Sequence, residues 1–146
     1  MATEAGREPL LDLQGLSVAY RTARGPVRAL DGVSLAIGRG EALGLVGESG
    51  SGKSSVVLAI LGLLGAEAIV RADRARFDGV DLLAEAPALR GRRIATVFQD
   101  PSSALNPALS IGLQLGEPFS VHRGLAGGEV RARSAALLAE VGIHRV

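Results

Sequence analysis

The fold is decided by the stretch GESGSGKS, residues 47–54, which fits the phosphate-binding loop pattern GxxxxGK[ST]. Its lysine, Lys53, is the only lysine in a chain whose other basic side chains are arginines. Three glycines without Cβ atoms let the backbone turn successive N–H groups toward an anion. A helix starting near Gly52 would add the positive end of its dipole. The stretch therefore predicts a site for the phosphates of a nucleotide.

The last two residues of this loop have expected roles in binding phosphate and metal. Lys53 supplies a mobile positive charge for the β- and γ-phosphates, and Ser54 offers a hydroxyl to Mg²⁺, a cation that prefers oxygen ligands. A Gly/Ser-rich surface turn is the alternative interpretation of the same residues. The residues expected to bind the nucleotide are Gly47, Glu48, Ser49, Gly50, Ser51, Gly52, Lys53, Ser54 and Ser55.

The flanking sequence provides the test of this motif, because a phosphate loop follows a buried strand and opens a helix. The run Ala42–Val46 is short, apolar and preceded by turn glycines, so it predicts a buried strand. The run Val56–Leu64 is apolar on nearly all sides and predicts a helix buried against a sheet. It is too short for a membrane span, which needs about 20 such residues.

The segment before the loop alternates apolar and polar residues. Positions 11–20 alternate with a slip at Gly15, and positions 33–37 alternate again after the turn signal Asp31-Gly32. Two or three half-buried antiparallel strands are therefore expected there. With this prefix the chain resembles the ATP-binding subunit of an ABC transporter, in which such strands form a small antiparallel subdomain. The resemblance implies that Tyr20, at the end of the first strand, stacks on adenine; a tyrosine that only packs at a strand end is the alternative.

A second mark of the family is Val97-Phe98-Gln99-Asp100-Pro101, which follows an expected strand over 92–98. A glutamine at the carboxyl end of a parallel strand can offer its carbonyl to Mg²⁺ and its amide to a water or phosphate oxygen. The resemblance implies that Gln99 senses the γ-phosphate, binds the metal and acts in catalysis together with Lys53. The longer run Phe98–Pro107 resembles the branch that powers import of dipeptides, oligopeptides or nickel.

Other parts of the ABC ATP site do not occur in residues 1–146. The family carries an LSGGQ-type signature, a Walker B Asp followed by Glu, and a switch His. Leu125–Glu129 is interpreted instead as a turn and helix start, and Ala135–Glu140 as helix because of its Ala and Leu content. His122 and His144 are interpreted as lone surface histidines. We therefore expect weak phosphate binding and no ATP turnover by this chain alone.

The expected fold class is α/β: a partial phosphate-loop NTPase core with an N-terminal antiparallel β subdomain and the start of a helical subdomain. The expected boundaries are about 8–41 for the β subdomain, 42–106 for the core through the Gln loop, and 107–146 for the helical part. Helices are predicted over 111–122 and 129–141. Pro and Gly residues predict loops near 22–28, 65–75 and 100–107.

Composition and the resemblance together indicate which partners, cofactors and cellular location to expect. A net charge of +1 gives no argument for nucleic acid, and the absence of cysteine excludes disulfides and thiolate metal sites. Neither a signal peptide nor a membrane-spanning segment is expected. The resemblance implies ATP and Mg²⁺ as cofactors, with a second nucleotide-binding subunit and membrane-spanning permease subunits as partners. It implies a cytoplasmic location, peripheral to the membrane through those partners and without direct insertion.

Three functions compete at this point. The first is an energy-coupling ATP-binding subunit of a peptide or nickel importer. The second is a different phosphate-loop enzyme, such as a small-molecule kinase or a GTPase, although the NKxD-type motif that selects guanine needs a second lysine. The third is a truncated, hydrolysis-incompetent fragment that acts at most as a nucleotide- or partner-binding module.

Overall fold

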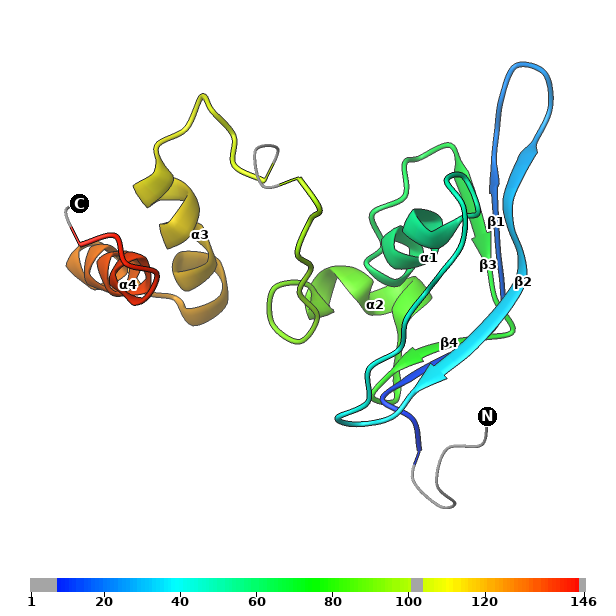
Figure 1. Ribbon diagram of the computed structural model, residues 1–146, viewed down its shortest axis with the longest axis horizontal. Coiled ribbons are helices and arrows are strands. Elements are labelled where there is room, and N and C mark those ends of the chain that lie inside the picture. The colour runs from blue at the N-terminus through cyan, green and yellow to red at the C-terminus, as the bar shows by residue number, and fades with distance from the viewer. Residues whose placement is uncertain (1–7, 101–103, 145–146) are drawn as a thin grey trace. The chain divides into compact units, whose positions relative to one another are not determined.

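The computed structural model describes residues 8–100 and 104–144. The chain forms two compact units, residues 1–90 and residues 91–146 (Figure 1). Among the described residues, the first unit contains the β-strands and two helices, and the second contains two further helices. The α/β class expected from the sequence is confirmed.

A five-stranded antiparallel sheet forms the framework of the first unit. The order is β2-β1-β4-β5, and β3 pairs with the second half of β1 while β4 pairs with the first half. The long strand β1 therefore pairs with three other strands. The strands are β1 (Leu11–Tyr20), β2 (Val27–Ile37), β3 (Ala68–Arg71), β4 (Arg74–Phe77) and β5 (Val80–Asp81).

The alternating pattern of β1 is what buries one face of this sheet. Leu11, Leu13, Leu16 and Val18 are all buried. The predicted slip at Gly15 is confirmed, because the pairing register with β2 shifts between Leu13 and Leu16. The N–H of Gly15 donates a hydrogen bond of 3.0 Å to Ser34 Oγ across this irregularity. The extra residue keeps the later apolar side chains on the core side.

Two short helices complete the core of the first unit. They are α1 (Lys53–Ile60) and α2 (Leu82–Leu89). Asp81 ends β5 and also caps α2, because its carboxylate accepts hydrogen bonds from the N–H groups of Leu83 at 2.8 Å and Ala84 at 3.4 Å. Burial on nearly all sides was expected of the first helix, but in α1 only Val56 and Ala59 are buried.

Two predicted strands are not formed. Residues 42–46 and 95–98 have no regular secondary structure, and within 92–98 only an isolated bridge occurs at Ile94. Val46 is 97% exposed and Val97 is 98% exposed. A parallel strand needs hydrogen-bonded neighbours, and no strand within the described residues pairs with either segment. Conversely, β3 and β4 lie where a loop near 65–75 was expected.

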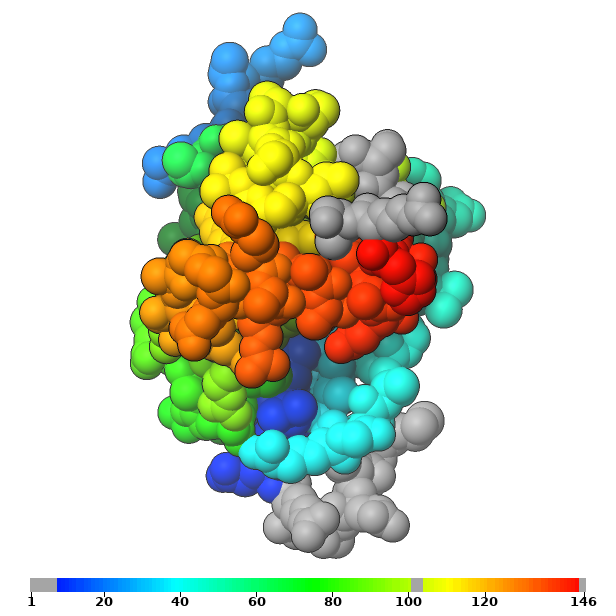
Figure 2. Space-filling model, turned by 90° about the vertical axis from the view of Figure 1, so that its left-hand side faces the viewer, coloured from blue at the N-terminus to red at the C-terminus, as the bar shows by residue number. Residues whose placement is uncertain are grey.

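The second unit is a pair of packed helices, α3 (Ile111–Arg123) and α4 (Gly128–Glu140). Their side chains form a continuous surface, yellow for α3 and orange to red for α4 (Figure 2). Ser110 caps α3 by accepting from Leu113 N–H at 3.3 Å, and Gly124 ends it in the left-handed region. Both helices lie within a residue of the predicted spans.

Candidate nucleotide-phosphate site

The phosphate loop joins an exposed segment to the first turn of α1. The N–H of Ser51 donates to the carbonyl of Glu48 at 3.2 Å, which closes a tight turn over 48–51. Gly52 occupies the N-cap of α1 with φ +91°, and the N–H of Val56 donates to its carbonyl at 3.0 Å. The predicted helix start is therefore confirmed. No side chain within the described residues caps this terminus, so the first N–H groups of α1 are free to bind an anion.

Gly52 fixes the loop against the sheet. A Cβ on this residue would lie 2.6 Å from Leu30 Cδ2 and 3.0 Å from the carbonyl oxygen of Ala29. Its φ of +91° is also a conformation that other residues rarely adopt. Glycine is thus required at Gly52 for two reasons, its backbone angle and its close approach to β2. Gly50 differs, since its φ is +82° but an added Cβ would meet nothing within 4 Å.

Lys53 folds back over the loop that precedes it. Its ammonium group donates to the carbonyl of Gly47 at 2.7 Å, to the carbonyl of Glu48 at 2.6 Å and to Ser51 Oγ at 3.1 Å. The single lysine of the chain therefore lies inside the glycine-rich turn. Because an ammonium has three donors and a flexible stem, it can exchange these acceptors for phosphate oxygens.

The remaining loop residues surround this turn. Glu48, Ser49 and Ser51 are exposed, as is Ser54 in the first turn of α1, while Ser55 is half-buried. The hydroxyl of Ser54 suits an oxygen-seeking cation, and free N–H groups with an ammonium suit phosphates. The described residues contain no cluster of three or more His, Cys, Asp or Glu side chains that could hold a metal without a nucleotide. The hydroxyl of Ser54, next to the ammonium of Lys53 and the first N–H groups of α1, fits a cation that arrives with phosphate oxygens.

Tyr20 lies at the end of β1, as predicted, and its cross-strand partner is Val27 on β2. Tyr20 is half-buried and Val27 is 56% exposed. Two residues back along β1, about 7 Å away, Val18 pairs with Leu30, the residue that Gly52 touches. Residues two apart on a strand share a face, so Tyr20 lies on the same face of β1 as Val18. Sequence reasoning missed Val27 because only the register brings it opposite Tyr20.

Gln99 belongs to the second unit, where it lies in an irregular, exposed segment rather than after a formed strand. Pro101, Ser102 and Ser103 of the predicted family motif lie outside the described residues. The role of Gln99 therefore stays a prediction. In the same unit, the side chain of Gln114 forms two hydrogen bonds with the backbone of Asn106. Its Oε1 accepts from the Asn106 N–H at 2.7 Å, and its Nε2 donates to the Asn106 carbonyl at 3.0 Å.

As interpreted from the sequence, the signature-like stretch 125–129 is a turn followed by a helix start, and the Walker B-like stretch 135–140 is helical. Gly127 precedes α4, Glu129 lies in its first turn, and Ala135–Glu140 forms its second half. His122 differs from the expected lone surface histidine. It is half-buried on α3, and its Nδ1 accepts a hydrogen bond of 3.4 Å from Arg92 Nε. The sequence could not predict this hydrogen bond, because its two residues lie 30 positions apart and only the fold brings them together.

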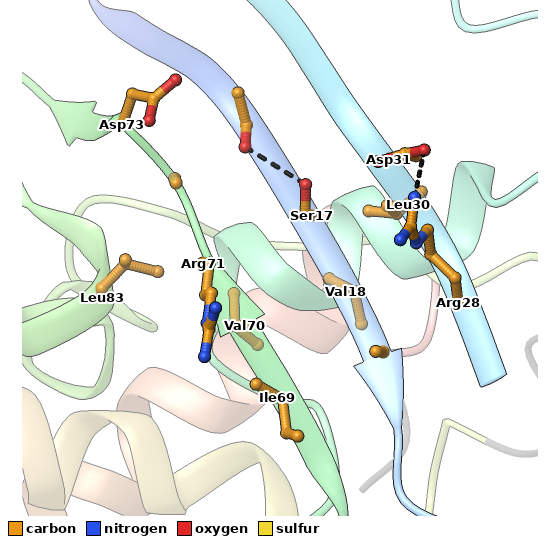
Figure 3. A pocket seen from close by; sticks show the side chains of 13 residues that line it. Ser17, Val18, Arg28, Leu30, Asp31, Ile69, Val70, Arg71, Asp73 and Leu83 are labelled. Carbon is orange, nitrogen blue, oxygen red and sulfur yellow. Dashed lines mark hydrogen bonds and ion pairs between the residues drawn. The ribbon is translucent and has the colours of Figure 1, made fainter. Parts of the chain in front are cut away.

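A cavity of about 800 Å³ lies on the antiparallel sheet, and its wall includes Leu30, the residue that Gly52 touches (Figure 3). Its wall carries two arginines and two aspartates, and Arg28 pairs with Asp31 at 2.5 Å. None of residues 47–54 lines it. Because the charges on its wall balance, the cavity favours neither anions nor cations, and the nucleotide site is defined by the loop instead.

The amino-acid sequence of the chain matches a known family over most of its length. The family model described as ABC transporter matches residues 30–146, so the chain belongs to the ABC transporter ATP-binding family. Its members bind ATP, and the match includes the whole phosphate loop. The resemblance stated from the sequence is confirmed.

The names of several relatives of the chain refer to peptide transport. A putative peptide import ATP-binding protein of Brucella melitensis is 44% identical over 142 residues, covering 94% of this chain and 43% of the relative. The dipeptide transport ATP-binding protein DppD of Escherichia coli K12 is 41% identical, covering 92% of this chain and 42% of the relative. The oligopeptide transport ATP-binding protein OppD of Mycobacterium tuberculosis is 44% identical, covering 94% and 23%. The chain thus spans less than half the length of these curated relatives.

The helices of the first and second units are short. Within residues 8–100 and 104–144, none is long and apolar enough to cross a membrane.

Proposed function

We propose that this chain is an ATP-binding, energy-coupling subunit of an ABC importer of peptide or nickel type. The observation that carries the proposal is the position of Lys53, whose ammonium lies within 2.7 Å of two carbonyls inside the glycine-rich turn. Within the part of the chain that the structure describes, no salt bridge joins Lys53 to an acidic side chain, so its charge is available to phosphate. Family membership and the peptide-import names of the relatives support the transport role.

In this proposal the nucleotide extends from β1 and β2 to the loop. Adenine stacks on Tyr20, with Val27 beside it as a second apolar contact. The phosphates lie over the free N–H groups of α1, and Lys53 exchanges its two carbonyl acceptors for β- and γ-phosphate oxygens. Mg²⁺, when bound, would neutralise phosphate charge, with Ser54 and Gln99 offering it oxygen ligands.

Hydrolysis and transport need more than these residues. In the family, ATP is cleaved between two nucleotide-binding subunits, which also contact membrane-spanning permease subunits. We propose the same partners here, and a peripheral place on the cytoplasmic face of the membrane through them. Lys53 and Gln99 would then act on the γ-phosphate as charge-stabilising and sensing groups.

A second candidate function is that of a hydrolysis-incompetent module that only holds a nucleotide or a partner. The absence of a signature, Walker B and switch His in residues 1–146 favours it for the chain by itself. The two candidates differ in phosphate release only when the partner subunits are present, where the first candidate predicts release and the second predicts none. The chain alone is expected to bind nucleotide without releasing phosphate above the background of the Lys53→Ala variant.

The test of nucleotide binding is a titration with a fluorescent ATP analogue and Mg²⁺. Lys53→Ala removes a charged hydrogen bond to phosphate, worth about 1.5–3 kcal/mol, so the dissociation constant should rise about 10- to 150-fold. Arg76→Ala is the matched control, because Arg76 is an exposed cation on β4 in the same unit. Its affinity should stay within about twofold of the parent. Equal binding by the parent and Lys53→Ala would contradict the proposal, as would no binding by the parent.

A further inference from the structure

The cavity on the antiparallel sheet has small residues along β1 and charged residues on the strands beside it. Ser17 lies opposite Arg71 of β3, and Ala19 lies opposite Arg28 of β2. Residues opposite each other in antiparallel strands point to the same face, and so do residues two apart on one strand. These four side chains therefore share the face of β1 that is turned away from the buried Val18. The volume of about 800 Å³ is that of a site for a small ligand.

Hydrogen bonds fix the floor of this cavity. The Ser17 hydroxyl donates to the Gly15 carbonyl at 3.4 Å and accepts from the Gly32 N–H at 3.0 Å. The floor is therefore held in place before a ligand binds. Ile69 and Leu83 add apolar surface to the lining, and Leu83 is 47% exposed. The cavity thus offers a fixed polar floor together with apolar contacts for the side chains of a ligand.

The charged side chains on the two walls differ in whether they are already paired. On the β2 side, Arg28 and Asp31 form an ion pair at 2.5 Å. On the β3 side, neither the Arg71 guanidinium nor the Asp73 carboxylate forms an ion pair or a hydrogen bond with any residue that the structure describes. Figure 3 shows these two side chains on the same side of β1 and apart from each other. One unpaired cation and one unpaired anion suit a ligand that carries both charges.

The two unpaired charges are separated along β1. Asp73 lies over Gly15, where an added Cβ would collide with its carboxylate, and Arg71 lies opposite Ser17. Positions two apart on a strand are about 7 Å apart. In a single amino acid the ammonium and the carboxylate are bonded to one carbon and lie about 2.5 Å apart, which is too short to reach both. A peptide of two or three residues spans about 6–10 Å between its charged ends, so it can contact both side chains.

We propose that the cavity on the antiparallel sheet binds a short peptide with free termini, two or three residues long. The ammonium of the peptide pairs with the Asp73 carboxylate, and its carboxylate pairs with the Arg71 guanidinium. Its backbone lies over Ser17, and its side chains contact Ile69 and Leu83. The inference goes beyond the proposed function and does not rest on it, because none of residues 47–54 lines the cavity.

Ligands with one kind of charge fit this cavity less well. Phosphate groups beside Arg71 would also lie near the carboxylates of Asp31 and Asp73, which repel them. A metal ion would meet two guanidinium groups, and the described residues contain no cluster of three or more His, Cys, Asp or Glu side chains that could hold one. A peptide with both termini free places each of its charges beside the opposite charge of the protein.

The experiment titrates the ¹⁵N-labelled 146-residue chain with dialanine, without nucleotide, and follows the backbone amides by two-dimensional NMR. The amide signals of Gly15, Ser17 and Asp73 should shift, with a dissociation constant of about 1 mM or below, and those of α4 should not. Free alanine should bind at least about fivefold more weakly, because it contacts one charge at a time. An absence of shifts at the three amides, equal affinity for alanine, or equal affinity for inorganic phosphate would overturn the proposal.

Blocking one terminus of the peptide at a time tests its orientation. N-Acetyl-dialanine lacks the ammonium and dialanine amide lacks the carboxylate, so each should bind the parent at least about fivefold more weakly than dialanine does. In Arg71→Ala, amidation should cause no further loss, whereas acetylation should still weaken binding. Asp73→Asn should show the reverse. Equal binding of the three peptides by the parent, or variants that keep both sensitivities, would overturn the proposal.

Matched variants control for the removed charges. Arg76→Ala removes an exposed cation from β4 and Glu85→Gln an exposed anion from α2, in the same unit but outside the cavity. Both should bind dialanine within about twofold of the parent. Equal weakening by Arg76→Ala and Arg71→Ala would indicate general charge attraction and overturn the proposal. Lys53→Ala should bind dialanine like the parent, so the peptide site stands or falls separately from the nucleotide site.

Discussion

The contact of Gly52 with β2 predicts unequal costs for two alanine substitutions in the same loop. Gly50 and Gly52 both have positive φ, at +82° and +91°. An added Cβ meets nothing within 4 Å at Gly50, but at Gly52 it would lie 2.6 Å from Leu30 Cδ2 and 3.0 Å from the Ala29 carbonyl. Gly50→Ala therefore tests backbone conformation alone, and Gly52→Ala tests conformation together with the contact.

The free energies follow from these two terms. Holding alanine at positive φ costs about 1–2 kcal/mol, which applies to both variants. Overpacking against Leu30 and a fixed backbone carbonyl adds about 1–3 kcal/mol for Gly52→Ala only. We expect the free energy of unfolding to fall by about 1–2 kcal/mol in Gly50→Ala and by about 2–5 kcal/mol in Gly52→Ala. The second loss is a large fraction of the stability of a typical domain.

Urea unfolding measures this difference within the first unit. The chain contains one tyrosine, Tyr20, and no tryptophan. Its emission therefore reports on β1, the strand whose partner β2 carries Leu30. The reasoning is refuted when Gly52→Ala loses no more stability than Gly50→Ala, since the contact with β2 would then carry no energy.

Three further predictions concern the base contact, a helix cap and the helix pair. Tyr20→Ala should weaken binding of the ATP analogue by about 1–3 kcal/mol and Tyr20→Phe should not, because stacking needs the ring alone; parallel titrations of the two variants decide this. Asp81→Ala should lower the free energy of unfolding, measured by urea denaturation, by about 0.5–2 kcal/mol through loss of the α2 cap. Asp81→Asn should lower it much less, because an asparagine side chain can still accept the capping hydrogen bond. Ser134 is 5% exposed on α4, and its hydroxyl has no hydrogen-bond partner within the described residues. Ser134→Ala should therefore raise the thermal midpoint of the helix pair, by up to about 1 kcal/mol in free energy, and a lowered midpoint would contradict this.

Local patterns in the sequence predict the local features well. The phosphate-loop pattern predicts the start of α1 at Lys53, and the alternation in 11–20 predicts β1 together with its slip at Gly15. Turn residues and composition predict helices α3 and α4, each of which is 13 residues long. In each case the residues that determine the structure are neighbours along the chain, so one stretch of sequence contains the signal.

Features that depend on distant partners could not be predicted. The strands β3 and β4 are four residues long, and they exist because β1 offers an edge to each half. The contact of Gly52 with Leu30 and the pairing of Tyr20 with Val27 come from tertiary packing and register. The expected strand at residues 42–46 failed for the same reason, since an apolar run becomes a strand only where another strand pairs with it.

The exposed apolar residues 42–46 affect how the chain behaves at high concentration. A short uncharged apolar stretch with a free backbone is the kind of sequence that adds to copies of itself and grows into aggregates. Glu41 and Glu48 flank the five residues, and Gly44 interrupts them with a residue of poor strand propensity. The two carboxylates repel their counterparts in a second chain, so they act as gatekeepers. Colloidal stability of the chain thus depends on the two acidic residues that lie on either side of this exposed stretch.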